Sequence, residues 1–199
     1  MGEIQSEEGS IWPRPAVWGV VAFLALALFG LLLFIASAWA AGFSALLFFL
    51  MAMILLTDLR AFIVPDVLSL PAIPLGILAN AMLAPSDTVA AVVTESLAGA
   101  VIGAGVLYLL RAVYFRLRNI EGLGLGDVKL AAVAGAWLGP GALAPACLLA
   151  ALAAFICLGV MAVLKGRNLL HARMPVPFGS FMAAAIVLVW IGQILGLMH

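Results

Sequence analysis

Two long runs without a charged residue decide what this chain can fold into. Residues 16–57 form an uncharged run of 42 residues, and residues 130–164 form another of 35. A bilayer core of about 30 Å takes roughly 20 helical residues, so each run has room for more than one crossing. The whole chain is 9% charged, against roughly 25% in soluble domains. The sequence therefore predicts an integral membrane protein whose surroundings are the lipid bilayer.

Turn signals divide the chain into seven membrane segments. The first run breaks near SAWAAG at 37–42, and Gly139-Pro140-Gly141 interrupts the second, because proline removes a helical hydrogen bond. The predicted fold class is an all-α polytopic bundle of six or seven transmembrane segments. The number is six if the short segment does not cross the membrane fully and seven if it does. Residues 1–15 are expected to be a tail and 16–199 a single membrane domain. The predicted segments after the first two are 67–86, 90–113, the short 127–138, 142–164 and 178–198.

The basic residues give the orientation. With seven segments, all nine fall at one face of the membrane, which the positive-inside rule identifies as the cytoplasmic face. The N-terminus is then cytoplasmic; its acidic sequence lacks the basic start and cleavage site of a signal peptide. The net charge of zero predicts no nucleic-acid partner. The nine are Arg14, Arg60, Arg111, Arg116, Arg118, Lys129, Lys165, Arg167 and Arg173.

Four acidic residues fall at the same face: Asp58, Asp66, Glu121 and Asp127. Between Asp58 and Asp127 the chain crosses the membrane and returns, so two carboxylates 69 positions apart can meet at one depth. If Pro140 marks the outer surface, Asp127 lies roughly 10 Å below the cytoplasmic boundary of a ~30 Å core. Acidic residues at such a depth are costly and usually functional.

Some of these acidic residues also have a simpler interpretation than a functional one. Asp127 could cap the helix that follows, with Lys129 extending outward. Asp66 follows a proline and is expected to be an N-cap. Asp58 closes a helix at its C-terminal end, where the dipole disfavours an acid, so capping does not explain it. Arg60 is either its partner or, as favoured here, an ordinary anchor at the inner face.

The glycines before Asp127 predict a close approach of another chain. Gly124 and Gly126 can adopt backbone angles closed to other residues, and we expect them to admit a substrate segment beside the acid. Cys147 and Cys157 are ten residues apart in an apolar stretch, a spacing that fits neither a redox motif nor a zinc site. Core packing is their expected role, and no metal site is predicted.

Three stretches together resemble a known family, the type IV prepilin peptidases, which are membrane aspartyl proteases of the GxGD type. The resemblance extends over roughly residues 50–181. It implies that Asp58 and Asp127 are the catalytic pair, and that Asp66, where the family often has Asn, is not catalytic. Asp66, Glu121 and Lys129 are candidate supporting residues. The stretches are TDLRAFIVPDVLSLP at 57–71, EGLGLGDVKLAAVAGAWLG at 121–139 and PVPFGSF at 175–181.

The resemblance also implies the reaction and its setting. Two carboxylates sharing a proton would activate water without cofactor or metal, and would cut prepilin or pseudopilin precursors at the cytoplasmic face of the inner membrane. The larger family members carry an insert with paired CxxC motifs and N-methylate the product. This chain has no such insert, so it resembles the short, peptidase-only members found with Flp-type pili, without N-methyltransferase activity.

Two other functions stay open at this stage. Paired acids in a membrane also occur in proton-coupled transporters, although the chain shows no internal repeat of the kind that transporters carry. A non-catalytic membrane protein of the pilus assembly apparatus would fit the hydrophobicity but would not explain the paired acids.

Overall fold

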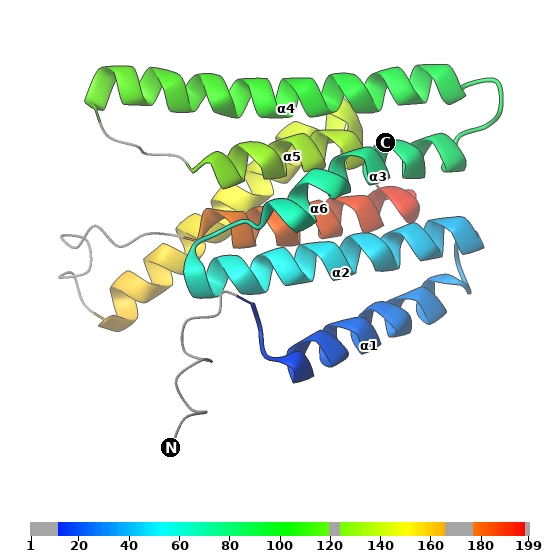
Figure 1. The fold of residues 1–199 in the computed structure, drawn as a ribbon, viewed down its shortest axis with the longest axis horizontal. Helices are drawn as coiled ribbons and strands as arrows, with labels where there is room; N and C mark the ends of the chain where they lie inside the picture. The colour runs from blue at the N-terminus through cyan, green and yellow to red at the C-terminus, as the bar shows by residue number, and fades with distance from the viewer. Residues whose placement is uncertain (1–11, 120–123, 166–176, 198–199) are drawn as a thin grey trace.

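The computed structural model describes residues 12–119, 124–165 and 177–197, and these form helices without any strand (Figure 1). Five of the helices are long and apolar enough to cross a membrane, and α6 is apolar but shorter. The chain is therefore an all-α, multi-pass membrane protein, as predicted. The helices are α1 Pro15–Leu32, α2 Ala38–Ala61, α3 Asp66–Leu83, α4 Val89–Arg118, α5 Leu125–Lys165 and α6 Phe178–Ile194.

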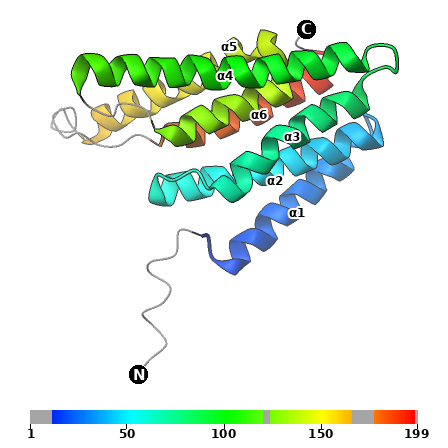
Figure 2. The same cartoon turned by 45° about the horizontal axis from the view of Figure 1, so that its top comes forward.

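Helix α5 is bent sharply at Gly139. This residue has φ 73° and ψ 171°, a conformation that glycine adopts at little cost, and the next residue is a proline without an N–H. The bend divides α5 into a first arm, residues 125–138, and a second arm, residues 140–165. Figures 1 and 2 show the two arms running in opposite directions. Counting the arms separately gives the seven predicted segments, and the short one is the first arm.

Side chains from neighbouring helices satisfy the backbone at this bend. The bend leaves the last carbonyls of the first arm without helical partners, and an unpaired carbonyl inside a membrane costs several kcal/mol. The Asn80 amide on α3 donates to the carbonyl oxygens of Ala136 at 2.9 Å and Trp137 at 3.0 Å. The Gln193 amide on α6 donates to that of Leu138 at 3.1 Å. Three helices are thus tied together where the chain reverses.

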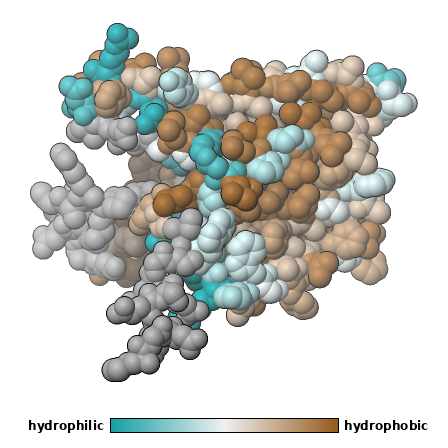
Figure 3. Space-filling view, viewed as in Figure 1, coloured by the Kyte–Doolittle hydropathy of each residue, from teal (hydrophilic) through white to brown (hydrophobic). Residues whose placement is uncertain are grey.

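The helices alternate in direction, so their ends form two opposite faces. Helices α1, α3, α6 and the first arm of α5 begin at the face where α2, α4 and the second arm end (Figure 1). We call this face the aspartate end, because it carries Asp58 and Asp127. Helix α1 packs against α2 alone among the described helices, at one edge of the bundle. Apolar residues cover most of the surface visible in Figure 3, as expected for a surface in contact with lipid.

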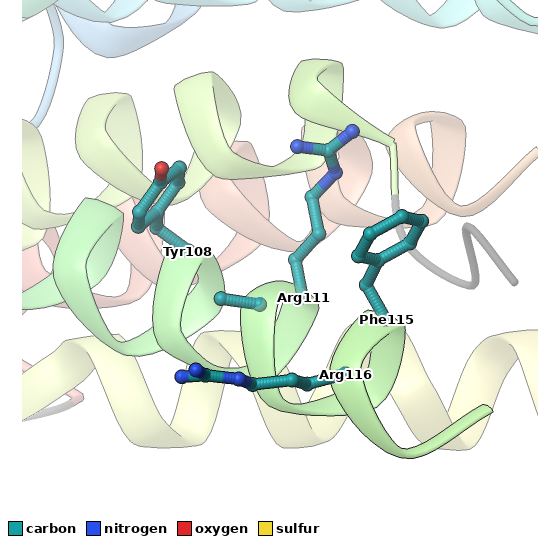
Figure 4. Close-up of a pocket in the computed structure, with 5 residues that line it drawn as sticks. Tyr108, Arg111, Phe115 and Arg116 are labelled. Atoms are coloured by element: carbon teal, nitrogen blue, oxygen red, sulfur yellow. The ribbon is translucent and has the colours of Figure 1, made fainter. Parts of the chain in front are cut away.

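The described basic residues gather at the aspartate end. Near the end of α4, a cavity of about 390 Å³ is lined by aromatic and basic side chains, including Tyr108, Arg111, Phe115 and Arg116 (Figure 4). Basic and aromatic side chains are typical of a membrane–water boundary. Arg167 and Arg173 lie outside the described residues, as do residues 1–11 of the expected tail. The basic residues whose side chains are described are Arg14, Arg60, Arg111, Arg116, Arg118 and Lys129.

Helix α4 and the first arm of α5 touch backbone to backbone. A Cβ atom added to Gly135 would lie 1.9 Å from the carbonyl oxygen of Gly99, and one added to Gly103 would lie 2.2 Å from that of Ala131. The small residues repeat every four positions on both helices, the spacing that lets membrane helices approach closely. This contact fixes the arm that carries Asp127.

Candidate active site

Asp58 lies in the last turn of α2 and is buried, with 5% of its surface exposed. The helix ends at Ala61, and the next residue, Phe62, has a left-handed backbone and donates its N–H to the carbonyl oxygen of Asp58. The negative end of the helix dipole therefore lies beside a carboxylate, an unfavourable arrangement. A buried acid in this position requires compensation from elsewhere in the fold.

The first turn of α6 supplies that compensation. The backbone N–H of Ser180 donates to Oδ2 of Asp58 at 2.6 Å, and its hydroxyl donates to the same oxygen at 2.8 Å. Helix N-termini carry N–H groups without helical partners and a partial positive charge. A Cβ atom on Gly179 would lie 3.1 Å from Cγ and Oδ2 of Asp58, so glycine there lets α6 come close.

Ser180 was not among the residues that sequence reasoning selected. The stretch that contains it, PVPFGSF, enters the prediction only through the family resemblance. The usable signal was its position: a serine in the first turn of a helix that begins at the same face as both aspartates.

Asp127 lies in the first turn of α5, at the same end of the bundle as Asp58 (Figure 1). The two carboxylates are close enough to interact electrostatically, and the backbone N–H of Gly124 forms a hydrogen bond with Asp127. A side chain in the first turn that accepts a hydrogen bond from the N–H of the residue before the helix is a form of N-terminal capping. Asp127 thus makes a capping contact and also lies within electrostatic range of Asp58, so the two interpretations are compatible, and its catalytic role stays a prediction.

Asp66 is not the N-cap of α3, so that prediction was wrong. Pro65 occupies the cap position and makes no side-chain capping bond, while Asp66 is the first residue of the helix. Its carboxylate instead forms an ion pair with Lys129 on α5. With the two side chains 59% and 30% exposed, such a pair is worth about 0–1 kcal/mol. The ion pair joins the start of α3 to the start of α5. Glu121, the other predicted supporting residue, lies outside the described residues.

The two glycines before Asp127 have different surroundings. A Cβ atom on Gly126 would lie 2.8 Å from Cγ2 of Val64, whereas one on Gly124 would meet its nearest atom at 3.6 Å. The expectation that both glycines admit a substrate is therefore corrected for Gly126, because Val64 fills that space. A larger residue at 126 would displace Val64, so loss of activity there would not report a substrate contact. Gly124 is exposed and retains open space.

The sequence pattern of the type IV leader peptidase family matches residues 45–163. The chain belongs to this family. The matched region of this leader peptidase homologue contains both aspartates and the bend at Gly139. It leaves out α1, which packs only on α2 among the described helices, and also α6, which supplies the contacts to Asp58.

Curated relatives of the chain carry names of two kinds. It is 38% identical over 127 residues to a "Prepilin leader peptidase/N-methyltransferase" of Burkholderia pseudomallei, covering 64% of this chain and 38% of that protein. A protein of the same name from Pseudomonas aeruginosa is 37% identical over 160 residues, covering 78% and 52%. "Leader peptidase HopD" of Escherichia coli is 36% identical over 136 residues, covering 68% and 83%. No solved structure matches.

The chain therefore spans about half or less of the relatives named for two activities, and most of the length of the one named for leader peptidase alone. Within the described residues, no group of three potential metal-ligating side chains of His, Cys, Asp or Glu occurs. The polar groups that the site offers for chemistry are two interacting carboxylates and the donors that surround them.

Proposed function

We propose that this protein is a membrane aspartic endopeptidase that removes the short leader from type IV prepilin-like precursors, of the Flp pilin or pseudopilin kind. The observation that carries the proposal is that Asp58 and Asp127 lie at the same end of the bundle, within electrostatic range of each other. The two residues are 69 positions apart in the sequence. The relatives' names, which include prepilin leader peptidase and leader peptidase, support the substrate class.

The reaction needs one carboxylate of the pair to accept a proton and the other to donate one. A water molecule loses a proton to the first carboxylate while its oxygen bonds to the scissile carbonyl carbon. The second gives its proton to the carbonyl oxygen, and the tetrahedral intermediate then collapses with a proton passing to the leaving nitrogen. No covalent intermediate forms with the protein. The supporting residues Asp66 and Lys129 hold α3 and α5 together beside this pair.

We place the site at the cytoplasmic face of the inner membrane. The aspartate end carries the described basic residues, and such residues are retained on the cytoplasmic side. A precursor with a basic leader in the cytoplasm and an apolar helix in the bilayer would present its cleavage point at this boundary. The proposed partners of the protein are therefore the lipid bilayer and the precursor.

The direct test is co-expression with candidate precursors from the same genome. Cleavage appears as a faster-migrating product whose new N-terminus can be sequenced. A mature N-terminus without an added methyl group, read by intact mass, is expected of a peptidase without N-methyltransferase activity. If no type IV prepilin-like precursor of that genome is shortened, the proposed function is wrong.

The orientation can be tested by cysteine accessibility. Cys147 and Cys157 are first replaced by alanine, and single cysteines are then placed at Arg118 or Ser86, which lie at opposite faces of the bundle. We expect an impermeant thiol reagent to label Ser86→Cys in intact cells and Arg118→Cys only after the cytoplasm is opened. Labelling of both positions from one side would contradict the seven-segment arrangement.

The Asp66→Asn variant should keep most of its activity. It removes one partner of an exposed ion pair worth about 0–1 kcal/mol and leaves both proposed catalytic carboxylates in place. We expect a cleavage rate within about fivefold of the unmodified protein, and a similar result for Lys129→Gln. An inactive but folded Asp66→Asn protein would mean that the first catalytic aspartate is Asp66 and not Asp58.

A further inference from the structure

The two donors from α6 both reach the same oxygen of Asp58. Ser180 is 4% exposed, and its N–H and hydroxyl lie 2.6 Å and 2.8 Å from Oδ2. The hydroxyl also lies 3.2 Å from the carbonyl oxygen of Leu55. Because a hydroxyl has one hydrogen, it favours the shorter contact to a carboxylate, which makes the stronger bond. Oδ2 therefore accepts two hydrogen bonds, and Oδ1 is the oxygen left for a reacting water.

The charges around Asp58 differ from those around Asp127. Helix α6 contributes its positive end and contains no titratable side chain. The group facing Asp58 from α5 is Asp127, which has a single backbone N–H, from Gly124, as its described donor. On α3, Asp66 is already paired with Lys129 of α5. The two donors and the start of α6 therefore offset the negative end of α2 that lies beside Asp58, and they hold one oxygen of this carboxylate in place.

We infer that Ser180 is a positioning residue that fixes Oδ2 of Asp58 and leaves Oδ1 for the reacting water, so that Asp58 is the general base and Asp127 the general acid of the proposed peptidase. The inference rests on the proposed function. Oδ1 of Asp58 accepts a proton from water as the water oxygen bonds to the scissile carbon, and Asp127 gives its proton to the carbonyl oxygen. When the C–N bond breaks, Asp58 passes its proton to the leaving nitrogen. Asp127 recovers a proton from the hydroxyl of the intermediate, which restores both residues.

The test is precursor cleavage by Ser180→Ala, measured as separate kcat and KM values with the purified full-length protein in lipid vesicles. The variant keeps the backbone donor and loses the hydroxyl. We expect kcat to fall about tenfold, because Asp58 is held less firmly toward the reacting water. The KM should change little. Ser180→Thr, which keeps a hydroxyl, should recover the kcat of the unmodified protein.

Ser44→Ala is the matched control. Ser44 is also buried between α2 and α6, where its hydroxyl donates to the carbonyl oxygen of Ala40 at 2.7 Å and accepts from Nε1 of Trp190 at 2.9 Å. It should lower thermal stability without lowering kcat. An unchanged kcat in Ser180→Ala, or an equal loss of kcat in Ser44→Ala, overturns the inference while cleavage by the unmodified protein upholds the peptidase function. Failure of the unmodified protein to cleave would overturn both.

Discussion

Replacing either Asp58 or Asp127 by asparagine is expected to lower precursor cleavage by about a thousandfold or more. An asparagine side chain can neither accept the proton of the attacking water nor donate one to the carbonyl oxygen at neutral pH. The fold should survive both changes. An amide oxygen at position 58 can still accept from the N–H and hydroxyl of Ser180, and one at position 127 can still accept from the N–H of Gly124.

The measurement is product formation in co-expression, normalised to the amount of each variant in the membrane. Asp87→Asn is the matched control, because Asp87 is exposed in the connection between α3 and α4 at the opposite end of the bundle. That variant should cleave normally. Substantial cleavage by a folded Asp58→Asn or Asp127→Asn protein would refute the assignment of the pair.

Gly135→Ala is expected to have the largest effect on folding. Even the single added methyl group would lie 1.9 Å from the carbonyl oxygen and 2.1 Å from the carbonyl carbon of Gly99, so α4 and the first arm of α5 must separate. Overpacking of this kind typically costs 1–3 kcal/mol, and a backbone contact without a flexible side chain to move should cost about 3 kcal/mol or more. Less protein in the membrane and a lower melting temperature in detergent would show the loss.

Gly105→Ala separates this effect from a general intolerance of alanine. Gly105 is also on α4, but a Cβ atom there would meet nothing within 4 Å. Since alanine has the higher helix propensity, this variant should be at least as stable as the unmodified protein. Equal melting temperatures for Gly135→Ala and Gly105→Ala would contradict the backbone contact between the two helices.

Much of the arrangement follows from hydropathy and charge. The uncharged runs and the glycine and proline at 139 and 140 predict the number of segments, and an even number of crossings then places Asp58 and Asp127 at one face. The bend itself is local, because it depends on a positive φ that glycine adopts and on a proline that cannot continue the hydrogen-bond ladder. These features depend on the chain's own residues and so can be predicted without knowing which helices are neighbours.

The contacts between helices could not be predicted in this way. Ser180 looks like Ser44 and Ser69, which are also buried serines, yet the latter two donate to carbonyl oxygens of their own helices or the residue before them. Which buried serine faces a carboxylate is decided by the rotation of α6 against α2. The same holds for Gly126, whose neighbour Val64 comes from a different part of the chain. Asp66 was misplaced by one residue, the usual uncertainty of a helix boundary.

The bend at Gly139 also makes the number of residues in the first arm of α5 a fixed quantity. From Asp127 to Leu138 the helix covers about 18 Å, and each added or deleted residue shifts the carboxylate by about 1.5 Å and turns it by about 100° around the axis. A single insertion would therefore direct Asp127 away from Asp58, and the insertion of two full turns that restores its direction would displace it by about 10 Å. Residues 130–138 of this arm are all buried, and no insertion or deletion keeps both the depth and the direction of Asp127.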